Sequence, residues 1–135
     1  MSAALFSIKP QFAQAILRGE KKFEFRTKAC KCKLTTMFIY ATKPIGMVIG
    51  EVSIETVISE EPEELWKLTH NDAGISKSEF DQYFQGRKKA YAYKLRNPIA
   101  YNQGILLEDL GIKRAPQSYC YIEDRLYPKI VRPSD

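Results

Sequence analysis

The sequence has no long apolar run, and this absence limits where the chain can work. No segment approaches the roughly 18 consecutive apolar residues that a membrane-spanning helix needs, and the first residues lack the charged, apolar and small order of a secretory signal. The chain holds only three cysteines, an odd number that argues against a disulfide framework. We therefore expect a cytoplasmic protein with free thiols and no membrane contact.

Motifs that hold metals, phosphates or nucleophiles are also missing. The sequence contains no glycine-rich phosphate loop and no nucleophile elbow. Cys30, Cys32, Cys120 and His70 could supply four zinc ligands, but they lack the spaced pairs of a structural zinc site. His70 lies near the end of a predicted helix, where interaction with the helix dipole is the simpler role. We expect no metal and no cofactor.

The sequence does carry an uneven distribution of charge. Residues 1–50 hold nine Lys and Arg against two acidic residues, residues 51–80 hold two against eight, and residues 81–135 hold ten against six. A fold that joins the two basic segments would attract a polyanion such as nucleic acid, although a net charge of +5 also serves solubility alone. The length of 135 residues fits one domain over residues 1–135.

Apolar periodicity and turn residues predict an α+β fold. Strands are expected over residues 5–8, 22–26, 34–42, 47–58, 90–96 and 119–122, and helices over 11–18, from Pro62, and from Ser76 to Gly86. Asn97 and Pro98 are expected to end the fifth strand. This order indicates a small mixed or antiparallel β-barrel with an early helix and a helical insert.

The second predicted strand has alternating faces. Phe23 and Phe25 share one face, which we expect to enter the barrel, and Glu24 and Arg26 share the other, which we expect to be a wet face turned toward a cleft. A carboxylate and a guanidinium on one face can address the same ligand. The simpler alternative is a solvated strand face with weak cross-strand pairs.

Residues 5–26 resemble the opening motif of the ASCH family, whose Gly-x-Lys-x-x-Glu-x-Arg signature falls on Gly19, Lys21, Glu24 and Arg26. Residues 39–52 resemble its central hairpin and residues 116–119 its closing strand. The resemblance covers most of residues 3–122, and residues 123–135 are expected to be a variable tail. It implies a PUA-like barrel with a cleft, beside the first helix and second strand, that accepts RNA or a modified base.

The predicted binding site combines this resemblance with residue chemistry. Lys9 precedes the first helix, where a phosphate could meet both an ammonium and the helix dipole. Thr42 and Lys43 lie in a turn, where plain turn chemistry is an equal explanation. The predicted nucleic-acid or nucleotide-binding set is Lys9, Lys21, Glu24, Arg26, Thr42, Lys43, Gln117 and Ser118.

Three functions remain open from the sequence. The leading hypothesis is an ASCH domain that holds single-stranded RNA or a modified base in a basic cleft. The alternative is a metal-independent hydrolase acting on RNA or a modified nucleoside, since some ASCH members are ribonucleases or amidohydrolases. A buried Lys21 with a lowered pKa could then act as general base with Glu24. The second alternative is a protein-interaction domain.

The family's amidohydrolase group bears on the enzyme hypothesis. That group has a threonine nucleophile at the position of Glu24, which argues against this activity here, and Asp72 is the nearest candidate for its acidic position. The chain also places aromatic residues near Arg87, Lys88 and Lys89, a combination used to stack bases over a phosphate track. Most of these rings are nevertheless expected in the core. They are Phe80, Tyr83, Phe84, Tyr91 and Tyr93.

Overall fold

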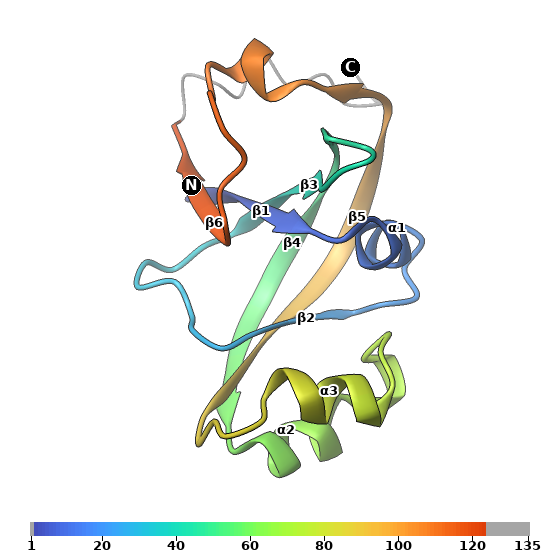
Figure 1. Cartoon of the computed structure of the whole chain (residues 1–135), viewed down its shortest axis with the longest axis vertical. Helices are drawn as coiled ribbons and strands as arrows, with labels where there is room; N and C mark the ends of the chain where they lie inside the picture. The colour runs from blue at the N-terminus through green and yellow to red at the C-terminus, as the bar shows by residue number, and fades with distance from the viewer. Residues whose placement is uncertain (1, 124–135) are drawn as a thin grey trace.

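The computed structural model describes residues 2–123, which form a curled six-stranded sheet with helices packed against it (Figure 1). Along the chain the elements are β1 (Ala3–Ile8), α1 (Pro10–Leu17), β2 (Phe23–Arg26), β3 (Thr36–Ala41), β4 (Met47–Glu60), α2 (Pro62–Thr69), η1 (His70–Asp72), α3 (Lys77–Tyr83), β5 (Ala90–Ile105), η2 (Leu107–Leu110) and β6 (Tyr119–Ile122). No helix within this range is long and apolar enough to cross a membrane.

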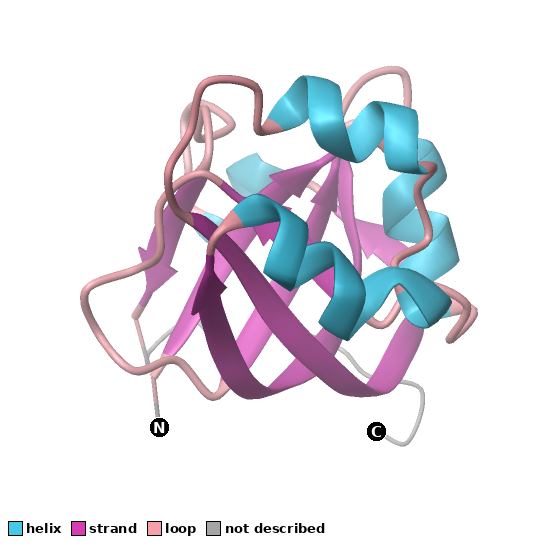
Figure 2. Cartoon of the chain, turned by 90° about the horizontal axis from the view of Figure 1, so that it is seen from below, coloured by secondary structure: helices cyan, strands magenta, loops and turns pink. Residues whose placement is uncertain are grey.

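The sheet has the strand order β2-β5-β4-β3-β1-β6. Neighbouring strands are antiparallel except for β1 and β3, which are parallel. Strands β2 and β6 are the two edges, so the backbone ladder does not close into a complete barrel. The α+β prediction is confirmed, and the barrel is a curled half-barrel with a seam between its edge strands (Figure 2).

The inside of the curl holds an apolar cluster that fixes α1 against the sheet. Phe6 of β1, Ile16 of α1 and Ile39 of β3 are buried together there. The helix approaches β4 closely at Gly50, where an added Cβ would lie 2.5 Å from the Ile99 carbonyl oxygen and closer than 3.0 Å to both Leu17 methyl carbons. Because only glycine fits this contact, Gly50 sets the distance between α1 and the sheet.

The helical insert forms a second apolar layer over the outside of β2. Phe23 and Phe25 are each 6% exposed and pack with Leu65 of α2 and with Phe80 and Phe84 of α3. Both phenylalanines were predicted to point into the barrel. They are buried, but they point outward from it, toward the helical insert. The insert covers the outer face of β2, so the phenylalanines are buried beneath it and their charged neighbours turn toward the inside of the seam.

Strand β5 does not end at Asn97 and Pro98, contrary to the prediction. Arg96 pairs with Ser53 and Ile99 with Glu51, so two residues of β5 lie opposite one residue of β4. This β-bulge absorbs a proline that cannot join the ladder, and Asn97 adopts a positive φ of 53° there. The predicted strand over residues 119–122 is confirmed as β6. The predicted tail lies outside the described residues, apart from Glu123.

Candidate functional site

Arg26 joins the two sides of the seam. Its Nη2 donates a hydrogen bond to the Ser7 carbonyl oxygen at 2.9 Å, and its Nη1 donates to the Ser118 hydroxyl at 3.0 Å. The guanidinium carbon also lies 5.1 Å from the centre of the Phe6 ring. Strand β2 has no backbone ladder to β1 or β6. The Arg26 side chain therefore links β2 to β1 and to the residue before β6.

The same guanidinium holds Glu24. Its Nε donates to Glu24 Oε2 at 3.0 Å, and Nη2 lies 2.8 Å from that oxygen. The side chains of Arg26 and Glu24 are only 13% and 10% exposed, so the expected wet face is largely buried. All three guanidinium nitrogens contact protein oxygens, which leaves little capacity for a ligand. Glu24 Oε1 has no hydrogen bond or ion pair to any residue in the range 2–123 and remains a possible acceptor.

Lys21 is buried beside this pair, with only 3% of the residue exposed. Its Nζ donates a hydrogen bond to the Ala73 carbonyl oxygen at 2.7 Å and lies 4.8 Å from the centre of the Phe25 ring. Burial disfavours the charged form and lowers the pKa of Lys21 to about 8, although the carboxylates of Glu24 and Glu79 act in the opposite direction. Lys21 is therefore mostly protonated near physiological pH but has an accessible neutral form.

The turn between η1 and α3, in the middle of the helical insert, positions Lys21. The Lys22 amide donates to the Asp72 carbonyl oxygen at 2.9 Å, one residue before the carbonyl that accepts from Lys21. Gly74 then lies against the lysine stem, because an added Cβ there would be 2.5 Å from Lys21 Cγ. Its φ of +70° also favours glycine. The lysine is thus enclosed by residues that are distant from it in the sequence.

These groups face a cleft of about 580 Å³ between α1, β2 and α3. The cleft is lined by Ser7, Ile8, Lys9, Gln11, Phe12, Lys21, Glu24, Phe25, Arg26, Ile75, Glu79, Gln82, Tyr83 and Gln117. Three cationic side chains and two carboxylates contribute to this lining, so its excess of positive charge is small. Tyr83 is 46% exposed at its wall, and burial of the remainder raises the pKa of its hydroxyl.

Most of the predicted site residues come together at this cleft. Five of the eight, Lys9, Lys21, Glu24, Arg26 and Gln117, line it. Ser118 is not among the lining residues but accepts a hydrogen bond from Arg26. Thr42 and Lys43 do not line the cleft, although the Thr42 amide donates to the Ile8 carbonyl oxygen at 3.0 Å, immediately before Lys9.

Sequence reasoning missed the contribution of α3. Glu79, Gln82 and Tyr83 line the cleft, but the predicted binding set contains none of them. Tyr83 was named only among the aromatic residues that could stack bases, most of which were expected in the core. The partial exposure of Tyr83 distinguishes it from buried Phe80 and Phe84 on the same helix. The available signal in the sequence was weak: a polar residue directly precedes an aromatic one at Glu79 and again at Gln82. The Asp72 side chain is not part of the lining.

The four residues considered as zinc ligands differ in exposure and in their contacts. Cys32 is exposed, Cys30 and Cys120 are half-buried, and the Cys30 amide donates to the Tyr93 hydroxyl at 2.8 Å. His70 follows α2, and its ring centre lies 6.1 Å from that of Trp66. Among residues 2–123, no three His, Cys, Asp or Glu side chains form a group suited to a metal ion. That the chain binds no zinc stays a prediction.

The model of the ASCH domain family matches residues 6–102, most of the chain. The chain belongs to the ASCH family. It is 34% identical over 135 residues to an ASCH domain-containing ribonuclease of Zymomonas mobilis, covering 95% of this chain and 89% of that protein. ASCH from Zymomonas mobilis also has a solved structure, with a TM-score of 0.85, 32% identity and coverage of 94% and 92% of the two chains.

A second ASCH crystal structure shows the same likeness. It is a mutant of the Zymomonas mobilis ASCH protein in which a tyrosine is replaced by phenylalanine. It matches with a TM-score of 0.86 and 31% identity, covering 96% of each chain. The ASCH assignment and the fold therefore rest on sequence and structure together.

Proposed function

We propose that this ASCH protein binds single-stranded RNA in the cleft and cleaves it without a metal ion. The observation that carries the proposal is Lys21, a buried amine with a pKa of about 8 that lines the cleft beside Glu24. A general base is most effective when its pKa lies near the working pH. The similarity of the whole chain to a protein named as a ribonuclease supports RNA as the substrate.

In the proposed reaction, neutral Lys21 removes the proton of a ribose 2′-hydroxyl, and the resulting oxygen attacks the adjacent phosphorus. The bond between phosphorus and the 5′-oxygen breaks, and that oxygen takes a proton from Lys9 or from water. The products are a 2′,3′-cyclic phosphate and a free 5′-hydroxyl. Lys21 returns its proton to solvent before the next turnover. Proton transfer by a positioned side chain typically accelerates such a step by about 10²- to 10⁴-fold.

The other residues of the cleft suit the binding of an unpaired nucleotide. Lys9 lies directly before α1, so a phosphate can meet its ammonium and the positive end of the helix. Glu24 Oε1 can accept a hydrogen bond from a ribose hydroxyl or a base amino group. Tyr83 offers a partly exposed ring on which a base can stack. Arg26 acts as a positioning residue, because its hydrogen bonds hold Glu24 and the seam.

A second candidate function is RNA binding without turnover. The engagement of Arg26 by the protein favours this candidate, since no free guanidinium within the cleft lining is left to stabilise the extra negative charge of a phosphorus transition state. A binding module would need only Lys9, Glu24 and Tyr83 as contacts. Both functions use the same binding contacts, but cleavage also needs Lys21 as the base and yields a product.

A single assay separates these functions. Labelled single-stranded RNA is incubated with the protein in excess EDTA, and bound RNA and cleaved product are measured together. We expect cyclic-phosphate product from the wild type and a loss of about 10²- to 10⁴-fold in rate with Lys21→Met. Lys67→Met is the matched control, because Lys67 is an exposed lysine of α2 that pairs with Glu64 outside the cleft.

Each outcome of that assay has a defined meaning. Binding without product from the wild type would favour the second candidate and contradict cleavage. Neither binding nor product would contradict both, and the protein-interaction hypothesis would then lead. Acetylated nucleosides included in the same assay test the amidohydrolase alternative. We expect no turnover of them, because Glu24 stands where that activity needs a hydroxyl nucleophile.

A further inference from the structure

Two loops that leave the same end of the β2–β5 pair carry six exposed cationic side chains. One loop, residues 27–35, follows β2, and the other, residues 84–89, precedes β5. Because the strands are antiparallel and Arg26 lies opposite Tyr91, the start of the first loop adjoins the end of the second. The six side chains, which we call the basic track, are Lys28, Lys31, Lys33, Arg87, Lys88 and Lys89, and all are exposed.

The basic track is not neutralised by the protein. None of its six members has a hydrogen bond or ion pair with any residue in the described range 2–123. Other exposed lysines differ: Lys67 pairs with Glu64, Lys77 with Glu63 and Asp81, and Lys94 with Glu55. Positive charge without local partners is the condition under which a surface attracts a polyanion most strongly.

Two carboxylates beside the second loop indicate the side of the track that an anion would use. Glu60 at the end of β4 pairs with Ala90, and Glu61 follows it. Strand β4 lies across β5 from β2, so both carboxylates are on the far side of the second loop. A polyanion would therefore follow the β2 side, over the loop that carries Lys28, and avoid the carboxylates.

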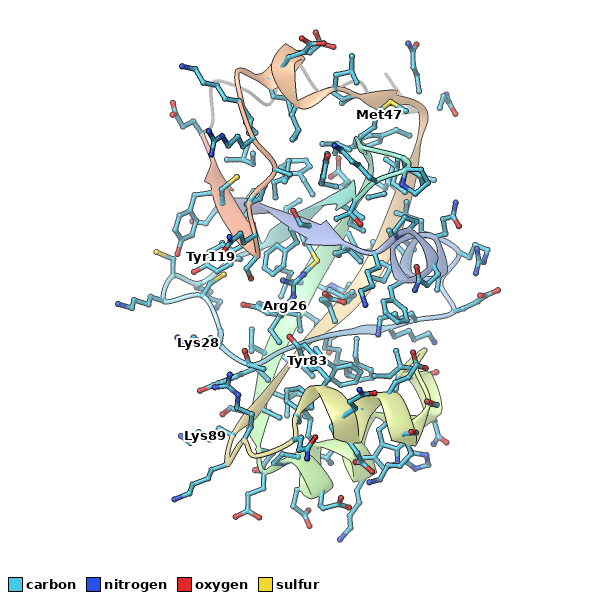
Figure 3. All side chains as sticks on the ribbon, in the orientation of Figure 1. Arg26, Lys28, Met47, Tyr83, Lys89 and Tyr119 are labelled. Carbon is cyan, nitrogen blue, oxygen red and sulfur yellow. The ribbon has the colours of Figure 1, made fainter. Side chains whose placement is uncertain are left out.

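Tyr83 connects the cleft to the basic track. Its ring lines the cleft, and its hydroxyl interacts with Thr27, the residue directly before Lys28. Figure 3 shows Tyr83 near Arg26, with Lys28 and Lys89 projecting on one side of the molecule beyond them. A strand with one base stacked on Tyr83 would thus direct its next phosphates toward these lysines.

We propose that the basic track holds the RNA strand where it continues beyond the cleft, so that the substrate is an extended single strand and not a nucleoside or mononucleotide. This inference rests on the proposed function, because it assumes that the cleft receives RNA. Each phosphate contact along the track releases bound counterions, so the track contributes affinity that falls with salt. It adds no reacting group and leaves the chemistry to the cleft.

The test compares two variants that each lose two positive charges. Lys88→Ser with Lys89→Ser shortens the track, whereas Lys113→Ser with Arg114→Ser removes two exposed cations that follow η2, at the opposite end of the molecule (Figure 1). Binding of a labelled oligouridine of about 12 nucleotides, within the site sizes of single-strand binders, is measured against salt. Binding of a trinucleotide is measured in parallel.

We expect the track variant to weaken binding of the longer RNA and to lower its salt slope by about 1.4, or about 0.7 for each lost phosphate contact. Trinucleotide binding and the control variant should match the wild type. Unchanged binding of the longer RNA by the track variant, or equal weakening by both variants, would overturn the basic track while leaving the cleft intact. If the wild type binds neither RNA, the proposed function itself fails.

Discussion

Lys21 shows how one residue can acquire a reactive state from its surroundings. An ammonium in water has strong hydration, and the phenylalanine rings around Lys21 replace most of it with apolar contacts. One hydrogen bond to Ala73 compensates for only part of that loss. The result is a lysine whose pKa is displaced downward to about 8, so its neutral form is accessible under mild conditions.

Arg26 and Arg18 form the same kind of ion pair in opposite environments. Arg18 pairs with Glu20 at 2.9 Å with both side chains more than half exposed, whereas Arg26 pairs with Glu24 at 2.8 Å with both nearly buried. Arg26→Ala leaves a buried carboxylate without its partner and should lower the free energy of unfolding by about 3–5 kcal/mol. Arg18→Ala should change it little, because both charges of that pair face solvent.

Urea denaturation of the two variants at about pH 7 provides the comparison. Equal and small losses would show that Arg26 does not hold the seam. This expectation differs from the one drawn from sequence, which placed Arg26 on a wet strand face turned toward a cleft.

At the scale of elements, the helical insert both covers β2 and completes the site. Helix α3 begins with a capping box in which Ser76 and Glu79 bond to each other's backbone amides, as the sequence predicts. The turn between η1 and α3, just before this cap, supplies Ala73 and Gly74 around Lys21. A substitution at this turn should therefore alter the surroundings of Lys21 without changing a residue of β2, the strand that carries Glu24.

Gly74 and Gly86 give a matched test of this connection. Both have positive φ, +70° and +76°, so replacement by alanine causes similar backbone strain. An added Cβ at Gly74 would meet Lys21 at 2.5 Å, whereas at Gly86 no other atom lies within 4 Å. Gly74→Ala should destabilise the protein more than Gly86→Ala and displace Lys21 from its apolar site, which raises the pKa of Lys21.

Nuclear magnetic resonance of labelled lysine side chains measures the Lys21 pKa in the two variants, and thermal unfolding measures their stability. The same pKa in both variants would contradict the role given to Gly74. If Gly74→Ala is unfolded at the temperature of the measurement, the pKa is measured at a low temperature where the variant folds, and an unchanged value there contradicts the role equally.

The sequence predicted which elements exist better than where their faces point. A period of two shows that Phe23 and Phe25 share a side of β2, but it does not show that an insert some 40 residues later along the chain covers that side. The end predicted at Pro98 was wrong because a bulge can absorb a proline within a strand. Tyr83 was named among aromatic residues that could stack bases, but it was not singled out from those expected in the core, since helical spacing alone does not reveal partial exposure.

At the scale of the whole molecule, the seam explains why the cleft lies where it does. The sheet leaves β2 and β6 as edges, and side chains such as Arg26 connect them in place of backbone hydrogen bonds. An incomplete ladder leaves room for a ligand that a closed barrel would exclude. The two basic segments of the sequence meet near this seam through Lys28 and Lys89, as their charge pattern suggested.

The most direct test of the central claim is the pH dependence of RNA cleavage by the wild type in EDTA. Lys21 must be neutral to accept a proton, so we predict that kcat/KM rises with pH and reaches a plateau above a midpoint near the Lys21 pKa of about 8. Lys21→Met should lose this rise together with the activity. Cleavage that is independent of pH across this range, or that persists unchanged in Lys21→Met, would contradict the claim that Lys21 is the base.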